Sequence, residues 1–260
     1  MLDNTFRKMG ARVRIELFDG QTTPVMVDIQ RDRQGEFFLL KHDANRAPEI
    51  TILDVRPKER HLLLMSRFGK EKQKFLCGHD ERHWFVAAIP ESAPASNVAQ
   101  AKAALKPTEV REHEVCLAIR GKQRDRRRNR AFIRQGEWFF IPEPELQVPE
   151  LMILKNEPLV RSRMGKPHLA EECYRTGGQL VYVSRQAPEG LTEEAYRKRL
   201  RDDPSADRVA WRPMRRNPRV YVRGRISHAD HKTVVLTEWH RVYMNTETQA
   251  KANAAVVFLD

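Results

Sequence analysis

Hydrophobic residues in the first ninety positions recur in short runs that predict β-strands. From Ala11 to Leu17, apolar and polar side chains alternate, which places every second residue on one face of an extended chain. Six more apolar runs follow, separated by polar or glycine-containing connections such as Gly78-His79-Asp80. Seven short strands at this spacing favour a small β-barrel or β-sandwich over residues 1–90. The predicted strands cover residues 11–17, 25–29, 37–40, 50–55, 62–65, 72–76 and 84–89.

The pattern changes at residue 91, where proline, serine and alanine replace the alternating runs. Asn97 with Gln100 three positions later is typical of a helix N-terminus, and Pro107 is expected to end the helix that Val98–Leu105 would form. We therefore predict a linker with a short helix over residues 91–112.

Residues 113–260 mix strands and helices and are predicted to form a basic α+β domain, mostly of antiparallel strands. Two helices are expected, one over 168–175 closed by Gly177 and Gly178, and one that Thr192 caps and that runs to about Arg201. A hairpin is expected over 130–141, with its turn at Gln135-Gly136. The remaining predicted strands cover 114–120, 179–184, 219–223, 233–236, 239–243 and 255–259.

Charge is distributed unevenly along the chain. The 260 residues carry a net charge of +12, and 32% of them are charged. Basic residues exceed acidic ones by 2 in residues 1–100 and by 10 in residues 101–260. An excess confined to one part of a chain indicates an anionic partner more than general solubility.

The first basic cluster runs from Arg120 to Arg134 and holds eight basic residues against one acidic residue, Asp125. It lies between two predicted strands, so we expect an exposed loop. Arginine binds phosphate oxygens through its planar fork, and each phosphate contact releases counterions. The alternative is a solvated loop that pairs with the acidic residues of 143–150. The expected nucleic-acid contacts are Arg120, Lys122, Arg124, Arg126, Arg127, Arg128 and Arg130.

The second basic cluster runs from Arg208 to Arg225 and holds seven arginines and no acidic residue. After the turn at Asn217-Pro218, alternation predicts a strand with valines on one face and arginines with Tyr221 on the other. A basic strand face that bears an aromatic ring is typical of sheets that bind single-stranded nucleic acid. The alternative, which the residues leave open, is that Tyr221 packs against a neighbouring strand. The expected contacts are Arg212, Arg215, Arg216, Arg219, Tyr221, Arg223 and Arg225.

Histidines follow the second basic cluster. His228, Asp230 and His231 are close in sequence, and a hairpin over this region would bring His240 near them. Imidazole and carboxylate groups bind divalent metals, and they also supply the base for phosphodiester cleavage. These four residues are the candidate catalytic set, with the metal left unidentified. The alternative is a turn capped by Asp230 among ordinary surface histidines.

Other features narrow the class of protein. No apolar stretch approaches the length of a membrane span, and the N-terminus lacks the apolar core of a signal peptide. The three cysteines are odd in number and widely spaced, so reduced thiols and a cytoplasmic location are expected, with no membrane partner. Glycine-rich phosphate loops, nucleophile elbows and dinucleotide fingerprints are missing from the sequence.

Three hypotheses about function follow. The leading one is a protein that binds the backbone of RNA or DNA through the two basic clusters and needs no cofactor. The second is a metal-dependent nuclease or phosphodiesterase, in which the histidine set acts with a divalent ion. The third is a protein-interaction module whose basic face meets an acidic protein partner.

Overall fold

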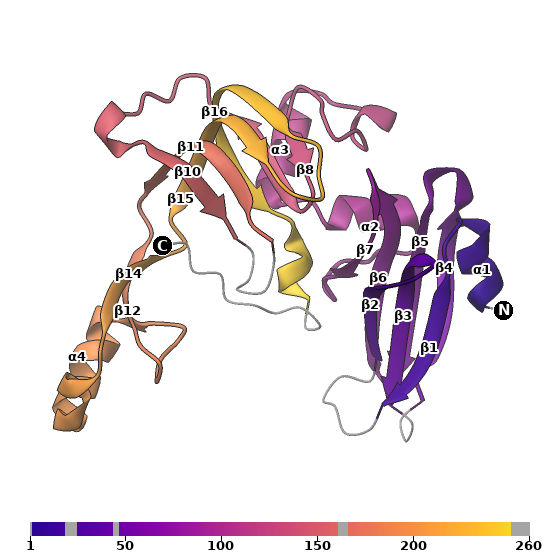
Figure 1. Ribbon diagram of the computed structural model, residues 1–260, viewed down its shortest axis with the longest axis horizontal. Coiled ribbons are helices and arrows are strands. Elements are labelled where there is room, and N and C mark those ends of the chain that lie inside the picture. The colour runs from indigo at the N-terminus through magenta and orange to yellow at the C-terminus, as the bar shows by residue number, and fades with distance from the viewer. Residues whose placement is uncertain (1, 19–24, 44–46, 161–165, 251–260) are drawn as a thin grey trace. The chain divides into compact units, whose positions relative to one another are not determined.

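The computed structural model describes residues 2–18, 25–43, 47–160 and 166–250, and its chain divides into two compact units (Figure 1). The first unit holds Met1–Phe139 together with the segment that begins at Tyr243, and the second holds Phe140–Val242. Each unit is described by itself below. The linker predicted over residues 91–112 lies inside the first unit.

All seven strands predicted in the first ninety residues are present. They form a three-stranded sheet of order β1-β3-β2 and a four-stranded sheet of order β4-β5-β6-β7. Only β1 and β3 pair in parallel; the other pairs are antiparallel. Within the described residues the strands close no barrel. Their bounds are β1 Val13–Phe18, β2 Val25–Asp32, β3 Gly35–Asp43, β4 Glu49–Arg56, β5 His61–Phe68, β6 Glu71–Asp80 and β7 His83–Ile89.

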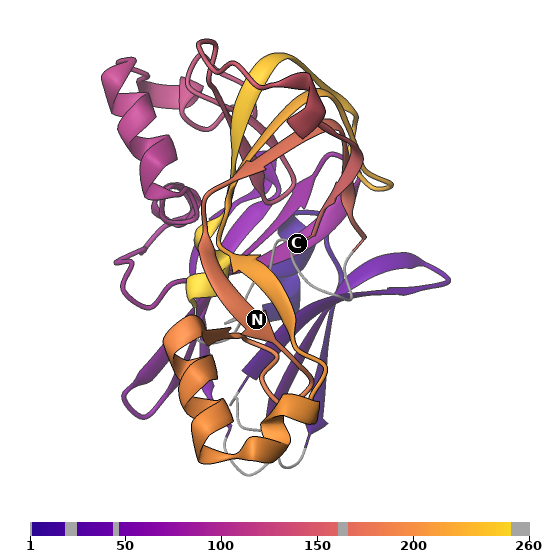
Figure 2. The same cartoon turned by 90° about the vertical axis from the view of Figure 1, so that its left-hand side faces the viewer.

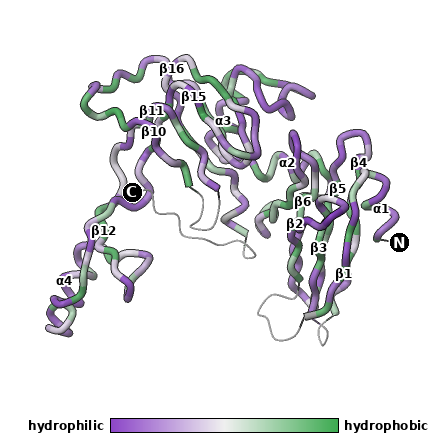
Figure 3. Tube along the Cα trace, viewed as in Figure 1, coloured by the Kyte–Doolittle hydropathy of each residue, from purple (hydrophilic) through white to green (hydrophobic). Residues whose placement is uncertain are grey.

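The four-stranded sheet is covered on both faces. Leu62 and Leu64 of β5 pack in a core with Phe38 of the other sheet and Phe6 of helix α1 (Leu2–Lys8). Leu63 points to the opposite face, into a second core that includes residues of helix α2 (Val98–Ala104). All three leucines are fully buried, each contributing about 2 kcal/mol of hydrophobic free energy. Burial on two faces explains why β5 contains a continuous apolar run, as β6 does at Phe75-Leu76-Cys77, whereas the exposed first residues of β6 are polar. Hydrophilic and hydrophobic stretches both occur along the chain (Figure 3).

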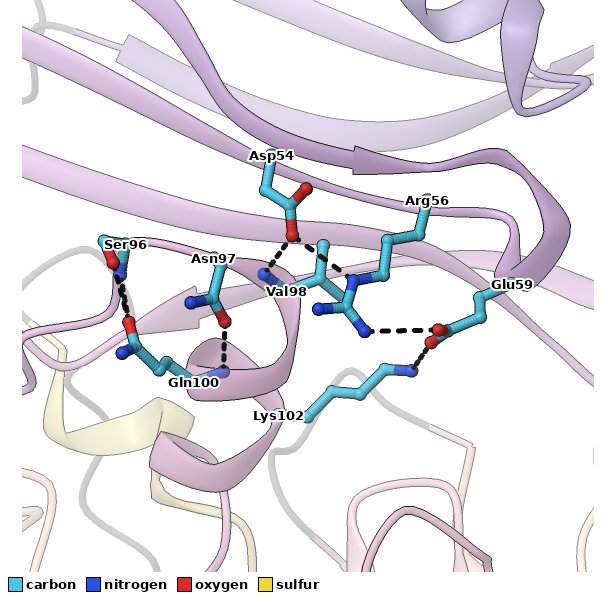
Figure 4. A network of polar contacts seen from close by, with 8 residues as sticks. All are labelled: Asp54, Arg56, Glu59, Ser96, Asn97, Val98, Gln100 and Lys102. Atoms are coloured by element: carbon cyan, nitrogen blue, oxygen red, sulfur yellow. Dashed lines mark hydrogen bonds and ion pairs between the residues drawn. The ribbon is translucent and has the colours of Figure 1, made fainter. Parts of the chain in front are cut away.

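Helix α2 begins as predicted. The Asn97 side chain accepts a hydrogen bond from the Gln100 backbone N–H at 2.9 Å. The Val98 N–H donates at 2.9 Å to Asp54 of β4, and Lys102 Nζ forms an ion pair with Glu59 at 2.7 Å (Figure 4). These bonds attach α2 to the sheet, so the helix is an integral part of the first unit.

The strand predicted over 114–120 is wrong, because Glu114 lies in helix α3 (Thr108–Cys116). Val110 and Glu114 are one helical turn apart, and both are buried. The Glu114 carboxylate accepts a hydrogen bond from Lys106 Nζ at 2.7 Å, and both side chains are less than a tenth exposed. A buried carboxylate needs such a partner, and Lys106 lies outside the segment on which the strand prediction was based.

The predicted hairpin over 130–141 is present as β8 (Ile133–Gln135) and β9 (Trp138–Pro142), with Gly136 at positive φ in its turn. In the second unit β9 continues a sheet of order β10-β11-β15-β16-β9. The pairs β10–β11, β11–β15 and β15–β16 are antiparallel. The other strands of this sheet are β10 Leu154–Leu159, β11 His168–Thr176, β15 Arg219–Ser227 and β16 Val234–Met244.

The helix predicted over 168–175 is wrong, because these residues form β11. A β-bulge between Ala170 and Glu172 shifts the alternation, so that His168, Ala170 and Cys173 are the buried residues of the strand. This uneven spacing resembles a helical face in the sequence. Gly177 and Gly178 have positive φ, as expected of a helix end, but they turn the chain out of the sheet instead.

Strand β16 replaces the two separate strands predicted over 233–236 and 239–243. A second irregularity lies in its pairing with β15: the step of two residues from Val222 to Gly224 corresponds to a step of four residues along β16, from His240 to Leu236. The strand predicted over 255–259 lies outside the described residues. Short 3-10 helices complete the chain at Pro57–Glu59, Gly121–Gln123, Glu150–Met152, Pro204–Arg208 and Thr246–Gln249.

Residues 177–218 leave the sheet after β11 and return to it at β15; we call this segment the arm (Figures 1 and 2). Its sheet has the order β13-β12-β14, from β12 (Gln179–Val183), β13 (Leu191–Thr192) and β14 (Arg212–Arg216). Helix α4 (Glu193–Asp202) begins where predicted, because the Thr192 hydroxyl accepts a hydrogen bond from the Ala195 N–H at 3.3 Å. The coarse prediction of a β-rich α+β protein with mostly antiparallel strands is confirmed.

The interior of the first unit imposes glycine at position 78. The sequence predicts a connection there, but Gly78 lies in β6, opposite His61 of β5. A Cβ atom on Gly78 would lie 2.5 Å from Cδ2 of His61 and 2.8 Å from Cε1 of Phe85. The two rings themselves are in edge contact, with centroids 5.7 Å apart. The strand therefore needs a residue without a side chain.

We predict that Gly78→Ala lowers the free energy of unfolding by about 1–3 kcal/mol, measured by urea denaturation, because both rings must move. In a His61→Ala background one of the two clashes is gone, and the same substitution should cost less. Equal costs in the two backgrounds would contradict this explanation.

His61 also predicts a pH dependence. Burial and the nearby Lys102 charge lower the pKa of His61 to about 4, whereas an unfolded histidine titrates near 6.5. Between these values the unfolded chain binds a proton that the folded chain does not. The contribution of His61 to the free energy of unfolding is therefore greatest above pH 6.5. It decreases as the pH falls towards 4, by at most about 1.4 kcal/mol per pH unit. Urea denaturation at pH 7 and pH 5 should show a smaller pH effect in His61→Gln than in the unchanged protein.

Candidate nucleic-acid interface and histidine cluster

The first basic cluster lies in the connection between helix α3 and strand β8, and its last residue, Arg134, belongs to β8; the sequence predicted a loop between two strands. Its backbone is held by hydrogen bonds: Asn129 Oδ1 accepts from the Ala131 N–H at 2.8 Å, and Lys106 Nζ donates to the Arg124 carbonyl at 2.6 Å. The loop therefore presents its side chains from a defined backbone. The exposed basic residues are Arg120, Lys122, Arg124, Arg126, Arg128 and Arg130.

Arg127 and Arg134 have a different role in the same cluster. Arg127 forms ion pairs with Asp80 and Glu81, and Arg134 pairs with Asp80 at 3.2 Å. Burial lowers the pKa of both arginines. Because these charges are already neutralised, Arg127 fastens the loop to the end of β6 and is a poor candidate for a phosphate contact.

The second basic cluster is divided between the arm and the main sheet of the second unit. Arg212, Arg215 and Arg216 lie on β14, where Arg216 donates a hydrogen bond of 2.5 Å to Gln179 Oε1. Arg219 and Arg225 lie on β15 with exposed side chains. The cluster is thus one basic strand of the arm followed by one strand of the sheet.

Arg223 and Tyr221 are used inside the second unit. Arg223 Nε pairs with Glu172 at 2.6 Å, and its guanidinium lies over the Trp239 ring, 4.8 Å from the centroid. The Arg223 and Lys155 charges lower the pKa of Glu172. Tyr221 is only 8% exposed and faces Tyr174 across the sheet, with ring centroids 6.0 Å apart. Little of its ring remains for a base to stack on, so Tyr221 acts as a cross-strand packing partner.

The two basic clusters concentrate exposed basic residues that have no ion pair. Arg7, Arg67 and Arg197 are exposed but paired with carboxylates, whereas Arg82 and Arg185 are exposed arginines outside the clusters that form no ion pair within the described residues. Across the described residues, no ion pair involves the exposed basic residues of the clusters. Within each cluster these residues lie close together along the chain, so their positive charge is concentrated. This set comprises Arg120, Lys122, Arg124, Arg126, Arg128, Arg130, Arg208, Arg212, Arg215, Arg219 and Arg225.

Three aromatic rings form the core of the arm. Tyr182 of β12 stacks on Tyr196 of α4 with centroids 4.0 Å apart, and Tyr196 contacts the edge of Trp211 at 5.2 Å. Trp211 Nε1 donates a hydrogen bond of 2.9 Å to the Ala206 carbonyl. No residue of α4 is fully buried. The rings therefore supply most of the contact that holds the helix beside β14 and its arginines.

A cluster of three histidines lies elsewhere in the second unit, and only two of them belong to the predicted set. His228 stacks on His168 with centroids 4.1 Å apart, and His231 lies 4.7 Å from His228 and 5.5 Å from His168. Asp230 forms an ion pair with Lys166 at 2.8 Å. His240 lies opposite Val222, five residues along β15 from Ser227, or about 16 Å away. The structure thus brings His228 and His231 together without His240.

Sequence reasoning missed His168. It is distant from His228 along the chain, and the predicted helix over 168–175 concealed the pairing that joins them. In the sheet Leu169 is opposite Ser227, which places the residues next to them side by side. The proximity of His168 to His228 therefore follows from the register of β11 against β15 and not from the sequence.

Hydrogen bonds define the protonation of His228. The Asp230 backbone N–H donates to its Nδ1 at 3.1 Å, so the ring proton lies on Nε2, which is 3.2 Å from the Lys166 carbonyl. Burial lowers the pKa of His168 to about 3, and the two neighbouring imidazoles add to this effect. The lowered pKa keeps the His168 ring neutral at neutral pH.

Models of known protein families, curated protein sequences and solved structures contain no match to this chain. None of the helices in the described residues has both the length and the hydrophobicity that crossing a bilayer requires.

We predict that Trp211→Ala loosens the arm and leaves the main sheet folded, because the tryptophan connects α4 with the segment before β14. Amide hydrogen exchange should become faster in α4 and β14 and stay unchanged in β15 and β16. Uniform acceleration in all four elements would contradict a separate aromatic core.

Proposed function

We propose that this protein binds the phosphate backbone of RNA or DNA through the exposed residues of its two basic clusters. The observation that supports this is the concentration of exposed basic residues without a carboxylate partner in the described part of the chain: six lie within residues 120–130 and five within residues 208–225. A row of unbalanced guanidinium groups repels itself and is stabilised by a polyanion. Nucleic acid is the polyanion that arginine forks match best.

The binding we propose depends on backbone charge and not on base sequence. Tyr221, the ring expected to stack on bases, is buried against Tyr174. The remaining groups are guanidinium and ammonium ions, which contact phosphates. Affinity should then come mostly from counterion release, and it should depend steeply on salt and weakly on sequence. No cofactor enters this interaction.

The test is fluorescence anisotropy with labelled single-stranded 20-nucleotide DNA and RNA at several salt concentrations. We expect the logarithm of affinity to fall linearly with the logarithm of salt concentration. The triple variant Arg120→Ala, Arg126→Ala, Arg128→Ala should reduce the slope by about 2, which corresponds to three lost contacts at about 0.7 each. The triple variant Arg212→Ala, Arg219→Ala, Arg225→Ala should reduce the slope by the same amount, because it removes three contacts from the second unit.

A matched control separates specific contacts from net charge. Arg7→Ala, Arg67→Ala, Arg197→Ala removes the same charge from exposed arginines that are paired with carboxylates. This control should lose much less affinity than either cluster variant. An equal loss in all three variants, or salt-insensitive binding, would refute the proposal. Tighter binding of polyglutamate than of nucleic acid would favour an acidic protein partner instead.

A further inference from the structure

Three imidazoles from two distant parts of the chain converge at one end of the second unit's sheet. His168 begins β11, and His228 and His231 lie in the connection between β15 and β16. One ring nitrogen from each residue can be chosen so that all three lie within 4.8 Å of one another. His168 is buried, and the other two side chains are half-buried.

The donor atoms select a class of metal ion. Magnesium, calcium and manganese prefer oxygen ligands, whereas neutral imidazole suits zinc and its neighbours cobalt, nickel and copper. The carboxylate of Asp230 is directed to Lys166, so the three nitrogens are the donors that the geometry offers.

The rearrangement needed for binding is small. Zinc–nitrogen bonds of about 2.0–2.1 Å in a tetrahedral site place ligand nitrogens about 3.3 Å apart. The cluster must therefore contract by about 1.5 Å at most from its 4.8 Å limit. The stacked rings must also tilt so that their nitrogens point at one centre. His228 must free a lone pair for the metal: either Nδ1 gives up the hydrogen bond from the Asp230 N–H, or the proton moves from Nε2 to Nδ1, which breaks the contacts with both Asp230 and the Lys166 carbonyl.

We propose that His168, His228 and His231 bind one divalent ion of the zinc class, with a fourth position open to water. The ion joins the start of β11 to the β15–β16 connection and so cross-links the end of the sheet. This inference does not rest on the proposed nucleic-acid function, and it replaces the metal set expected from sequence, which included Asp230 and His240.

The test uses the full chain without an affinity tag, stripped of metal and titrated with zinc by calorimetry at neutral pH. We expect one strong site per chain. His228→Ala and His231→Ala should each weaken zinc binding at least tenfold, since two imidazoles bind far less tightly than three. These residues lie in a connection and are half-buried, so both variants should fold; circular dichroism checks this.

The control is His113→Ala, which removes a histidine of similar burial that hydrogen-bonds to the Ala131 carbonyl in the first unit. Its zinc affinity should equal that of the unchanged protein. Zinc should raise the melting temperature of the unchanged protein and of His113→Ala, but not of His231→Ala. Magnesium should not compete with zinc. The proposal is overturned if zinc does not bind stoichiometrically, or if the His228 and His231 variants bind it as well as the control does.

Discussion

The antiparallel pairing of β11 with β15 is the constraint on which the second unit depends. Its register runs from Leu169 opposite Ser227 to Thr176 opposite Arg219. One end of this ladder brings His168 beside His228, and the other end is where the arm leaves and returns. Because side chains alternate along a strand, a slip of one residue would send His168 to the opposite face and move the base of the arm. The histidine cluster and the attachment of the arm, which carries the arginines of β14, are thus consequences of one register.

A bulge adjusts this register locally. The shift between Ala170 and Glu172 in β11 faces the segment of β15 that holds Gly224. Gly224 has positive φ, and a Cβ there would lie 2.7 Å from a carboxylate oxygen of Glu171. The same carboxylate accepts the Arg225 N–H at 2.8 Å, so it satisfies a backbone donor that the irregular ladder leaves over. The bulge therefore requires glycine at position 224, which leaves room for the carboxylate, and glutamate at position 171, which accepts the backbone hydrogen bond.

A feature could be predicted from sequence when the residues that determine it lie close together along the chain. Alternation and short apolar runs predicted all seven strands of the first ninety residues, and N-cap side chains predicted the starts of α2 and α4, because those signals are local. Prediction failed at His168–Arg175, where a bulge disturbs the two-residue period, and at Glu114, whose buried partner Lys106 lies two residues before its helix begins. The exposed basic clusters were visible as charge runs. Two features depend on contacts between distant segments of the chain and could not be predicted: the ion pairs that some of these arginines form, and the proximity of His168 to His228.

The arm begins and ends at neighbouring positions of the sheet, since Thr176 and Arg219 are opposite each other. A segment attached in this way is topologically equivalent to a long hairpin loop. Its length can change by insertion or deletion without altering any pairing in the sheet that carries it, and loop-closure entropy grows only slowly with length. Natural variation of this protein therefore has a place to add or remove basic surface while the rest of the second unit keeps its hydrophobic core.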